Sequence, residues 1–212
     1  MIVDVIMPSK TTPETMPMLM NCIASLKASE PRITFNVVLV ESSQYMACGQ
    51  DRTIDYDTDT FCYNHALNLG IKSTTNEWVI LANNDLIFHP FFMTAILDEH
   101  RLDSSIKSFS PWNPGYHDCC MSGDRDLFVG SRVCYELAGW CIVCRRELLE
   151  AINLSEHVDF WYSDNIYADE IVRHGFKHAL VRVSVVNHLC SRTIDFTTYD
   201  STIDLKKYLE KK

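Results

Sequence analysis

The sequence predicts an α/β protein with a mostly parallel sheet flanked by helices in a single domain. Short apolar runs alternate with segments whose apolar residues recur every three or four positions, which is the order of strands and helices in such folds. The chain has 212 residues, no internal repeat and no break in composition, so we expect one domain over residues 1–212. Its content of 47% hydrophobic and 22% charged residues is typical of a globular protein.

The first half of the chain contains three expected strands and three expected helices. The strands are short apolar runs bounded by turn residues, and we place them at residues 2–7, 35–40 and 78–82. The helices have apolar residues at helical spacing, and we place them at residues 14–28, 62–72 and 91–100. A polar, acidic loop is expected over residues 50–60.

The second half begins with a long segment, residues 103–135, that is rich in Ser, Pro, Gly and Cys and is expected to be irregular. Beyond it we expect a strand, a short helix and a last strand at residues 139–143, 145–152 and 179–186. Ser163 is expected to cap another helix, which Gly175 would end. Residues 191–212 are expected to form a C-terminal tail outside a core of residues 1–190, with a solvated, lysine-rich helix end.

Charge and cysteine content restrict the classes of protein that fit this chain. The net charge of −9 disfavours binding along a nucleic-acid backbone, because Lys and Arg supply that affinity. Nine scattered cysteines, an odd number, follow no visible secretory signal, so we expect free thiols and a cytoplasmic location. No membrane span is expected, because no apolar run reaches about 18 residues. The Cys141-x-x-Cys144 spacing suits zinc, but it falls in an expected strand and no second Cys or His pair matches it.

The most informative motif is the end of the apolar run that starts at Trp78. The run stops at Asn83-Asn84-Asp85, which would stand at the carboxyl end of a buried strand, where open α/β sheets bind ligands. A carboxylate flanked by amides suits a hard divalent cation that carries phosphates. The alternative is a strand-to-turn junction, since Asn and Asp are common turn residues.

Polar residues also follow the other expected strands. In a parallel sheet the carboxyl ends of the strands meet at one edge, so we expect these residues to lie together. They are Ser9 and Lys10, Glu41 and Ser42, Asn83 to Asp85, and Asn187 with His188. Together they offer a carboxylate and an imidazole for a metal, a second carboxylate for a nucleotide base, and a cation for phosphate, which outlines a nucleotide-sugar site.

Six motifs in this order, spanning residues 2–190, resemble family 2 glycosyltransferases of the GT-A (Rossmann-like) fold. Two are the first strand with Pro8-Ser9 and the second strand ending in Glu41-Ser42. Two more are Asn64-His-Ala-Leu-Asn68-Leu-Gly70, similar to the family's Ala-x-Asn-x-Gly helix, and Leu81-Ala-Asn-Asn-Asp85, similar to its metal-binding Asp-x-Asp tip. The last two are Ala138 to Arg146, which resembles the Gly-rich strand ending in Arg, and Asp159 to Asp164 followed by Gly175, which resembles the acceptor-side motif. His188 stands where many members have a His after the last core strand.

The resemblance implies a role for each matching residue. Asp85 and His188 would bind Mn²⁺ or Mg²⁺, and Asp164 would be the general base of an inverting transfer. Glu41 would accept an N–H of the donor's base, because a carboxylate is an acceptor only and suits the imide of uracil or thymine. A UDP-sugar is the expected donor. The other residues expected to bind the donor are Pro8, Ser9, Lys10, Ser42, Asn64, Asn68, Asn83 and Asn84.

Three positions depart from the family pattern. The tip carries one carboxylate instead of two, Ser163 stands where Glu is usual before the base, and Glu41 replaces the usual Asp. We therefore expect a glycosyltransferase that moves a sugar from a nucleoside diphosphate to the hydroxyl of a glycan or another acceptor. The alternatives are an inactive nucleotide-sugar-binding module of the same fold, a nucleotidyltransferase, and an enzyme that glycosylates modified DNA bases. The glycine-free Pro8-Ser9-Lys10-Thr11 turn disfavours the second of these, and the acidic charge disfavours the third.

Overall fold

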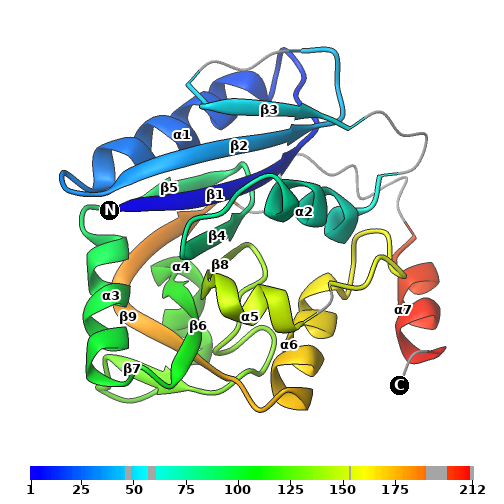
Figure 1. Ribbon diagram of the computed structural model, residues 1–212. Helices are drawn as coiled ribbons and strands as arrows, with labels where there is room; N and C mark the ends of the chain where they lie inside the picture. The colour runs from blue at the N-terminus through cyan, green and yellow to red at the C-terminus, as the bar shows by residue number, and fades with distance from the viewer. Residues whose placement is uncertain (46–48, 57–60, 153, 190–199, 211–212) are drawn as a thin grey trace.

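A computed structural model of the protein describes residues 1–45, 49–56, 61–152, 154–189 and 200–210. The strands are β1 (Ile2–Ser9), β2 (Thr34–Glu41), β3 (Arg52–Asp55), β4 (Trp78–Ala82), β5 (Leu86–Phe88), β6 (Ile106–Trp112), β7 (Leu127–Val129), β8 (Cys141–Arg145) and β9 (Lys177–His188). The helices are α1 (Met16–Ser29), α2 (Tyr63–Lys72), α3 (Phe92–Leu102), α4 (Pro114–Cys120), α5 (Arg146–Ala151), α6 (Ser163–Arg173) and α7 (Ser201–Glu210). The predicted α/β class is confirmed (Figure 1).

The strands form one mixed sheet in the order β3-β2-β1-β4-β8-β6-β9-β5, with β7 paired to β9. Strands β3, β2, β1 and β4 run parallel, and β8 enters antiparallel between β4 and β6. Because β6 is antiparallel to β8 and parallel to β9, both run in the direction of β4. The carboxyl ends of β1, β2, β4, β6 and β9 therefore lie at the same edge as the start of β8.

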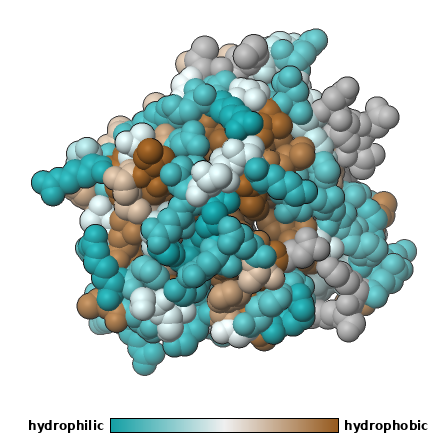
Figure 2. Space-filling view, in the orientation of Figure 1, coloured by the Kyte–Doolittle hydropathy of each residue, from teal (hydrophilic) through white to brown (hydrophobic). Residues whose placement is uncertain are grey.

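Two apolar cores lie on opposite faces of this sheet. Alternate residues of β1 enter each core, with Val5 and Met7 on the side of α1 and α3, and Ile6 on the side of α2, α5 and α6. Helix α2 lies very close to β1, since a Cβ atom on Gly70 would be 2.3 Å from Cγ2 of Ile6. Hydrophilic residues cover most of the face seen in Figure 2. None of the helices described is long and apolar enough to cross a membrane.

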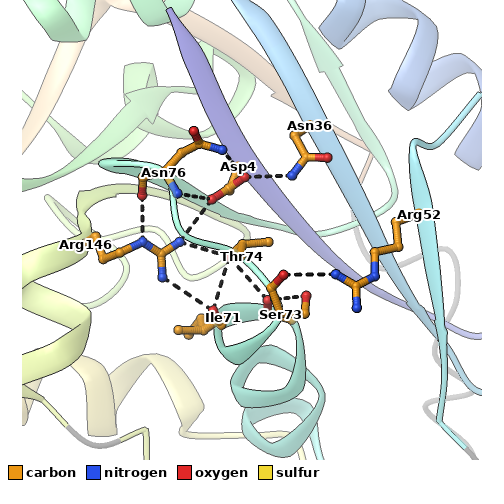
Figure 3. Close-up of polar contacts among 9 residues, drawn as sticks. Asp4, Asn36, Arg52, Ile71, Ser73, Thr74, Asn76 and Arg146 are labelled. Carbon is orange, nitrogen blue, oxygen red and sulfur yellow. Dashed lines mark hydrogen bonds and ion pairs between the residues drawn. The ribbon is translucent and has the colours of Figure 1, made fainter.

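A buried ion pair lies near the start of β1, at the edge of the sheet opposite to the carboxyl ends of the parallel strands (Figure 3). Asp4 of β1 is fully buried, and its carboxylate contacts Nη2 of Arg146 at 3.0 Å. The same carboxylate accepts hydrogen bonds from the side chains of Asn36 and Asn76, each at 2.7 Å. Burial by itself would raise the pKa of Asp4, but these donors and the guanidinium hold it below its ordinary value. The network ties β1, β2 and α5 together at the end away from the polar strand tips.

The segment expected to be irregular, residues 103–135, contains β6, α4 and β7, so that expectation was wrong. The sequence pattern did not predict strand β6, because two of its core positions are serines. Ser108 and Ser110 are both fully buried. The Ser108 hydroxyl lies 2.7 Å from Nδ1 of His178, and the Ser110 hydroxyl accepts the N–H of Ala138 at 3.0 Å. Partnered hydroxyls replace apolar groups here, so the alternation typical of a strand is hidden.

Three smaller expectations also changed. Part of the acidic loop at residues 50–60 is the edge strand β3, whose charged residues are common on sheet edges. Tyr162, and not Ser163, precedes the first turn of α6, and among the described residues no side chain caps that helix. Gly175 follows α6 with a φ of +72°, as expected for a glycine that ends a helix. The expected core boundary at residue 190 and most of the tail up to residue 200 lie outside the described residues, whereas residues 201–210 form α7.

Candidate active site at the carboxyl edge of the sheet

Asp85 and His188 meet at the carboxyl edge of the sheet. Strand β5 begins directly after Asp85 and pairs antiparallel with the end of β9, with Leu86 opposite His188. This register places Oδ1 of Asp85 3.3 Å from Nε2 of His188. Asp85 is 1% exposed, and its carbonyl accepts the N–H of Leu189 at 3.0 Å. Two residues far apart in the sequence thus bring a buried carboxylate against a partly exposed imidazole.

Trp140 adjoins this pair from the start of β8. Its ring stacks on that of His188, with centroids 5.4 Å apart and an interplanar angle of 19°. Its carbonyl accepts the N–H of Asn83 at 2.9 Å, which joins β8 to the end of β4. A half-buried indole is suited to pack against the apolar face of a sugar ring.

Both tip asparagines are held by protein groups. Asn84 donates from Nδ2 to the hydroxyl of Ser9 at 3.0 Å. The hydroxyl of Tyr63 donates to Oδ1 of Asn83 at 2.9 Å. Burial raises the pKa of Tyr63, and the nearby ionisable groups of Asp85, Cys141 and Asp164 add to this rise. Tyr63 was not predicted as a site residue, because it fits the apolar pattern of its helix and resembles any core tyrosine.

Asp164 lies in the first turn of α6, against the backbone before Trp140. A Cβ atom on Gly139 would be 2.7 Å from Cβ and 3.0 Å from Oδ2 of Asp164, so only glycine allows this approach. Oδ1 of Asp164 accepts the N–H of Asn165 at 2.9 Å. Burial raises the pKa of Asp164 above its ordinary value, and backbone hydrogen bonds offset part of this rise.

A small cavity lies beside the Asp164 carboxylate. Its volume of about 20 Å³ is sufficient for roughly one water molecule. Polar groups from α2 and α6 line it together with apolar residues of the core. The polar residues are Tyr63, Asn64, Ser163, Asp164 and Tyr167.

Glu41 closes the turn after β1. It is 3% exposed, and its Oε1 accepts the backbone N–H groups of Thr11 and Ser43, each at 2.9 Å, while its Oε2 accepts the Thr11 hydroxyl. The Ser42 hydroxyl donates to the carbonyl of Ser9 at 3.1 Å. A carboxylate has about four acceptor positions, and these three donors to Glu41 use three of them. Acceptance of an N–H from a nucleotide base therefore stays a prediction for Glu41.

Four further residues predicted to bind the donor occupy different surroundings. Pro8 is buried in β1 opposite Val40, whereas Lys10 is exposed in the turn that follows. Asn64 and Asn68 of α2 donate to the carbonyls of Ser155 and Leu154 at 2.8 and 2.9 Å. These two amides hold the segment that leads toward α6 and do not contact the Asp85–His188 pair in any described interaction.

The thiols of Cys141 and Cys144 do not form a metal site. They project into the two different cores, on opposite faces of the sheet, and burial raises both thiol pKa values. Among the residues that the structure describes, no group of three or more His, Cys, Asp or Glu side chains could hold a metal ion. The Asp85–His188 pair therefore supplies at most two protein ligands.

No protein-family model matches the chain, and no curated protein matches its sequence.

Proposed function

We propose that this protein is a metal-dependent, inverting glycosyltransferase of the GT-A fold and family 2. It would move a sugar from a nucleoside diphosphate, best a UDP-sugar, to the hydroxyl of a glycan or another acceptor. The observation that carries the proposal is the Asp85–His188 contact of 3.3 Å, with Trp140 stacked on the imidazole. The contact lies at the edge where α/β sheets bind nucleotides. Asp164 lies close to the same edge, because its side chain packs against Gly139 just before β8.

Asp85 and His188 fit a divalent cation as a partial set of ligands. A carboxylate oxygen and an imidazole nitrogen are both suitable for Mn²⁺, and two protein ligands leave positions for the donor diphosphate and water. A bound Mn²⁺ or Mg²⁺ would neutralise the charge that develops on the diphosphate as it leaves. Asn83 and Asn84, fixed by Tyr63 and Ser9, would keep the tip in the geometry that this requires.

Asp164 is the proposed general base. Its carboxylate would accept the proton of the acceptor hydroxyl while that oxygen forms a bond to the anomeric carbon and the bond from carbon to phosphate oxygen breaks. A raised pKa suits this role, because a base works best when its pKa approaches the operating pH. Trp140, between Gly139 and the His188 contact, would place the sugar between the two carboxylates.

One observation favours a second function, a nucleotide-sugar-binding module without turnover. The tip of β4 has a single carboxylate, and both neighbouring amides are engaged by Tyr63 and Ser9. Such a protein would bind UDP-sugar with Mn²⁺ but release no UDP. Binding and turnover must therefore be measured separately.

The test compares melting temperatures with UDP-, GDP- and dTDP-sugars, each with and without Mn²⁺, and then measures UDP release. A ligand at 100 times its Kd should add about 2.7 kcal/mol to the free energy of unfolding. We expect this only when Mn²⁺ and a UDP-sugar are both present, followed by slow UDP release without acceptor. When Asp85→Asn is measured in the same assay, Asp98→Asn, a change at an exposed acid paired with Arg101, is the control for charge removal. Absence of stabilisation by every donor with Mn²⁺ would overturn the proposal, and stabilisation without any UDP release would favour the binding module.

A further inference from the structure

A buried carboxylate of helix α7 binds the backbone of the segment that leads to α6. Asp204 is fully buried, and its Oδ1 accepts the backbone N–H of Asp159 at 2.9 Å. Its Oδ2 accepts the N–H groups of Phe160 and Trp161 at 2.9 and 2.8 Å. Figure 1 shows α7, in red, beside the yellow segment before α6. Consecutive N–H groups that face one anion form a charge-assisted nest, so a residue near the end of the sequence fixes this segment.

Further contacts of α7 reach both sides of the same region. Lys207 donates to Oδ2 of Asp159 at 2.8 Å, and the Tyr208 hydroxyl donates to Oδ2 of Asp169 at 2.7 Å. The ring of Tyr208 stacks on Tyr162, with centroids 5.4 Å apart and an interplanar angle of 11°. Asp159 and Tyr162 precede the first turn of α6, and Asp169 follows it. Helix α7 therefore restrains the start of α6 from two directions.

The turn into α6 needs this restraint. Tyr162 has a φ of +66°, a left-handed conformation that is uncommon for residues other than glycine. It separates the Asp204 nest from the first turn of α6, where Asp164 abuts Gly139 with no room for a methyl group. A small shift of the nest would therefore move the Asp164 carboxylate relative to the start of β8.

We propose that Asp204 is a positioning residue, whose carboxylate fixes residues 159–161 so that Asp164 faces the acceptor side of the site. The inference rests on the proposed function and adds a requirement for the C-terminal helix to it. Asp204 would touch neither donor nor acceptor. Its loss should slow transfer while the binding of the donor stays the same.

The test uses Asp204→Asn in the full chain, which keeps the size of the side chain but removes its charge and one acceptor oxygen. The matched control is Asp200→Asn, which removes the same charge next to the same helix, from an exposed residue that accepts the N–H of Thr202 and not the nest. We expect kcat to fall about 10- to 100-fold in Asp204→Asn, as for a catalytic group displaced by about 1 Å. Donor Kd should change less than twofold, and hydrogen exchange should accelerate in a peptide covering residues 158–164. The control should match the unchanged protein in all three measurements.

A second measurement does not depend on activity. The pKa of Asp164, followed by carbon NMR of its carboxyl group, should fall toward the ordinary value when the segment loosens and water enters. If the unchanged protein transfers no sugar from any donor, the proposed function fails, and this pKa still decides whether Asp204 positions Asp164. If Asp204→Asn keeps the kcat of the wild-type protein, the inference is overturned. If the wild-type protein transfers no sugar, an Asp164 pKa that is the same with and without Asp204→Asn would overturn it. Should Asp204→Asn not fold, Lys207→Met, which removes the contact to Asp159 and the cation near Asp204, should show the same changes at smaller size. Their absence would also overturn the inference.

Discussion

Asp85 and Asp164 are the two carboxylates on which the proposed chemistry depends, and their surroundings differ. Asp85 faces an imidazole at 3.3 Å, whereas Asp164 is surrounded by the Gly139 backbone and a small cavity. A cation between Asp85 and His188 would favour the ionised carboxylate, while the environment of Asp164 disfavours it. The two residues should therefore respond differently to removal of the charge.

Asp85→Asn should abolish stabilisation by Mn²⁺ with UDP-sugar. The change removes the charged oxygen of a ligand pair, and His188 alone binds a divalent cation weakly. Because Asp85 is 1% exposed, we also expect a loss of stability that a change at an exposed edge would not cause. Calorimetric titration with Mn²⁺ and UDP measures the first effect, and urea denaturation measures the second. An unchanged Mn²⁺ affinity would show that the metal lies elsewhere.

Asp164→Asn should lower kcat by about 10² to 10⁴ without changing donor Kd. Its effect on stability should have the opposite sign. The folded-state pKa of Asp164 is raised, so protonation stabilises the fold below the unfolded value of 3.8, and this contribution is lost as the pH rises through the folded-state pKa. At pH 7 the melting temperature of Asp164→Asn should therefore equal or exceed that of the wild-type protein, because Asn is neutral. Lower thermal stability together with normal turnover would mean that Asp164 serves only the helix.

We expect the same pKa shift of Asp164 to set the pH profile of the proposed transfer. Activity should rise with pH through the pKa of Asp164, which lies above 3.8, because only the ionised carboxylate accepts a proton. In Asp164→Asn this limb of the kcat/KM profile should disappear. Stopped assays from pH 4 to 8 measure it, and an identical limb in the variant would assign the titration to another group.

At the scale of elements, α2 is placed by one close contact with β1. Gly70→Ala would ordinarily stabilise a helix interior by about 1 kcal/mol. Here the new methyl group would lie 2.3 Å from Ile6, so we expect destabilisation of about 1–3 kcal/mol instead. Helix α2 also carries Tyr63 at its start, and donor binding should weaken with it. Urea denaturation of Gly70→Ala, of Ile6→Ala and of the double variant provides the measurement, and the loss in the double variant should be smaller than the sum of the two single losses, because Ile6→Ala removes the clash as well as the buried side chain.

The elements that the sequence predicts well are those that burial alone defines. Strand β4 was placed at its observed bounds, because each of its five residues is buried and apolar. Strand β6 was missed because Ser108 and Ser110 enter the core with hydrogen-bond partners that come from distant elements. Within the site, Asp85 and His188 were indicated by residue type at strand ends, whereas Asp164 was indicated by the resemblance of residues 159–164 to the acceptor-side motif of family 2 glycosyltransferases. Tyr63 could not be predicted in this way, because its role depends on a hydrogen bond to Asn83, a residue that only the fold brings next to the start of α2.

For the whole molecule, two buried histidines predict how stability depends on pH. Burial lowers the pKa of His117 and of His178 from 6.5 to about 4. The unfolded chain binds these protons first, so their contribution is complete above pH 6.5 and is lost as the pH falls toward 4. The slope is at most about 1.4 kcal/mol per pH unit for each histidine. Urea denaturation between pH 7 and 4.5 should show a shallower slope in His178→Gln, and an equal slope would mean that His178 is already charged in the fold.

The buried Asp4–Arg146 pair has a practical consequence for experiments on this protein. It marks the edge of the sheet at which the chain begins, and β1 extends from there over eight residues, roughly 26 Å, before it reaches Ser9 at the other edge. A surface, bead or fluorophore attached through Met1 would therefore leave the carboxyl edge of the sheet, where the proposed site lies, open to the solution. Attachment through a residue of α7 would place the same group on the helix whose Lys207 and Tyr208 contact Asp159 and Tyr162. Immobilised binding assays should give full donor affinity with the first geometry and reduced acceptor access with the second.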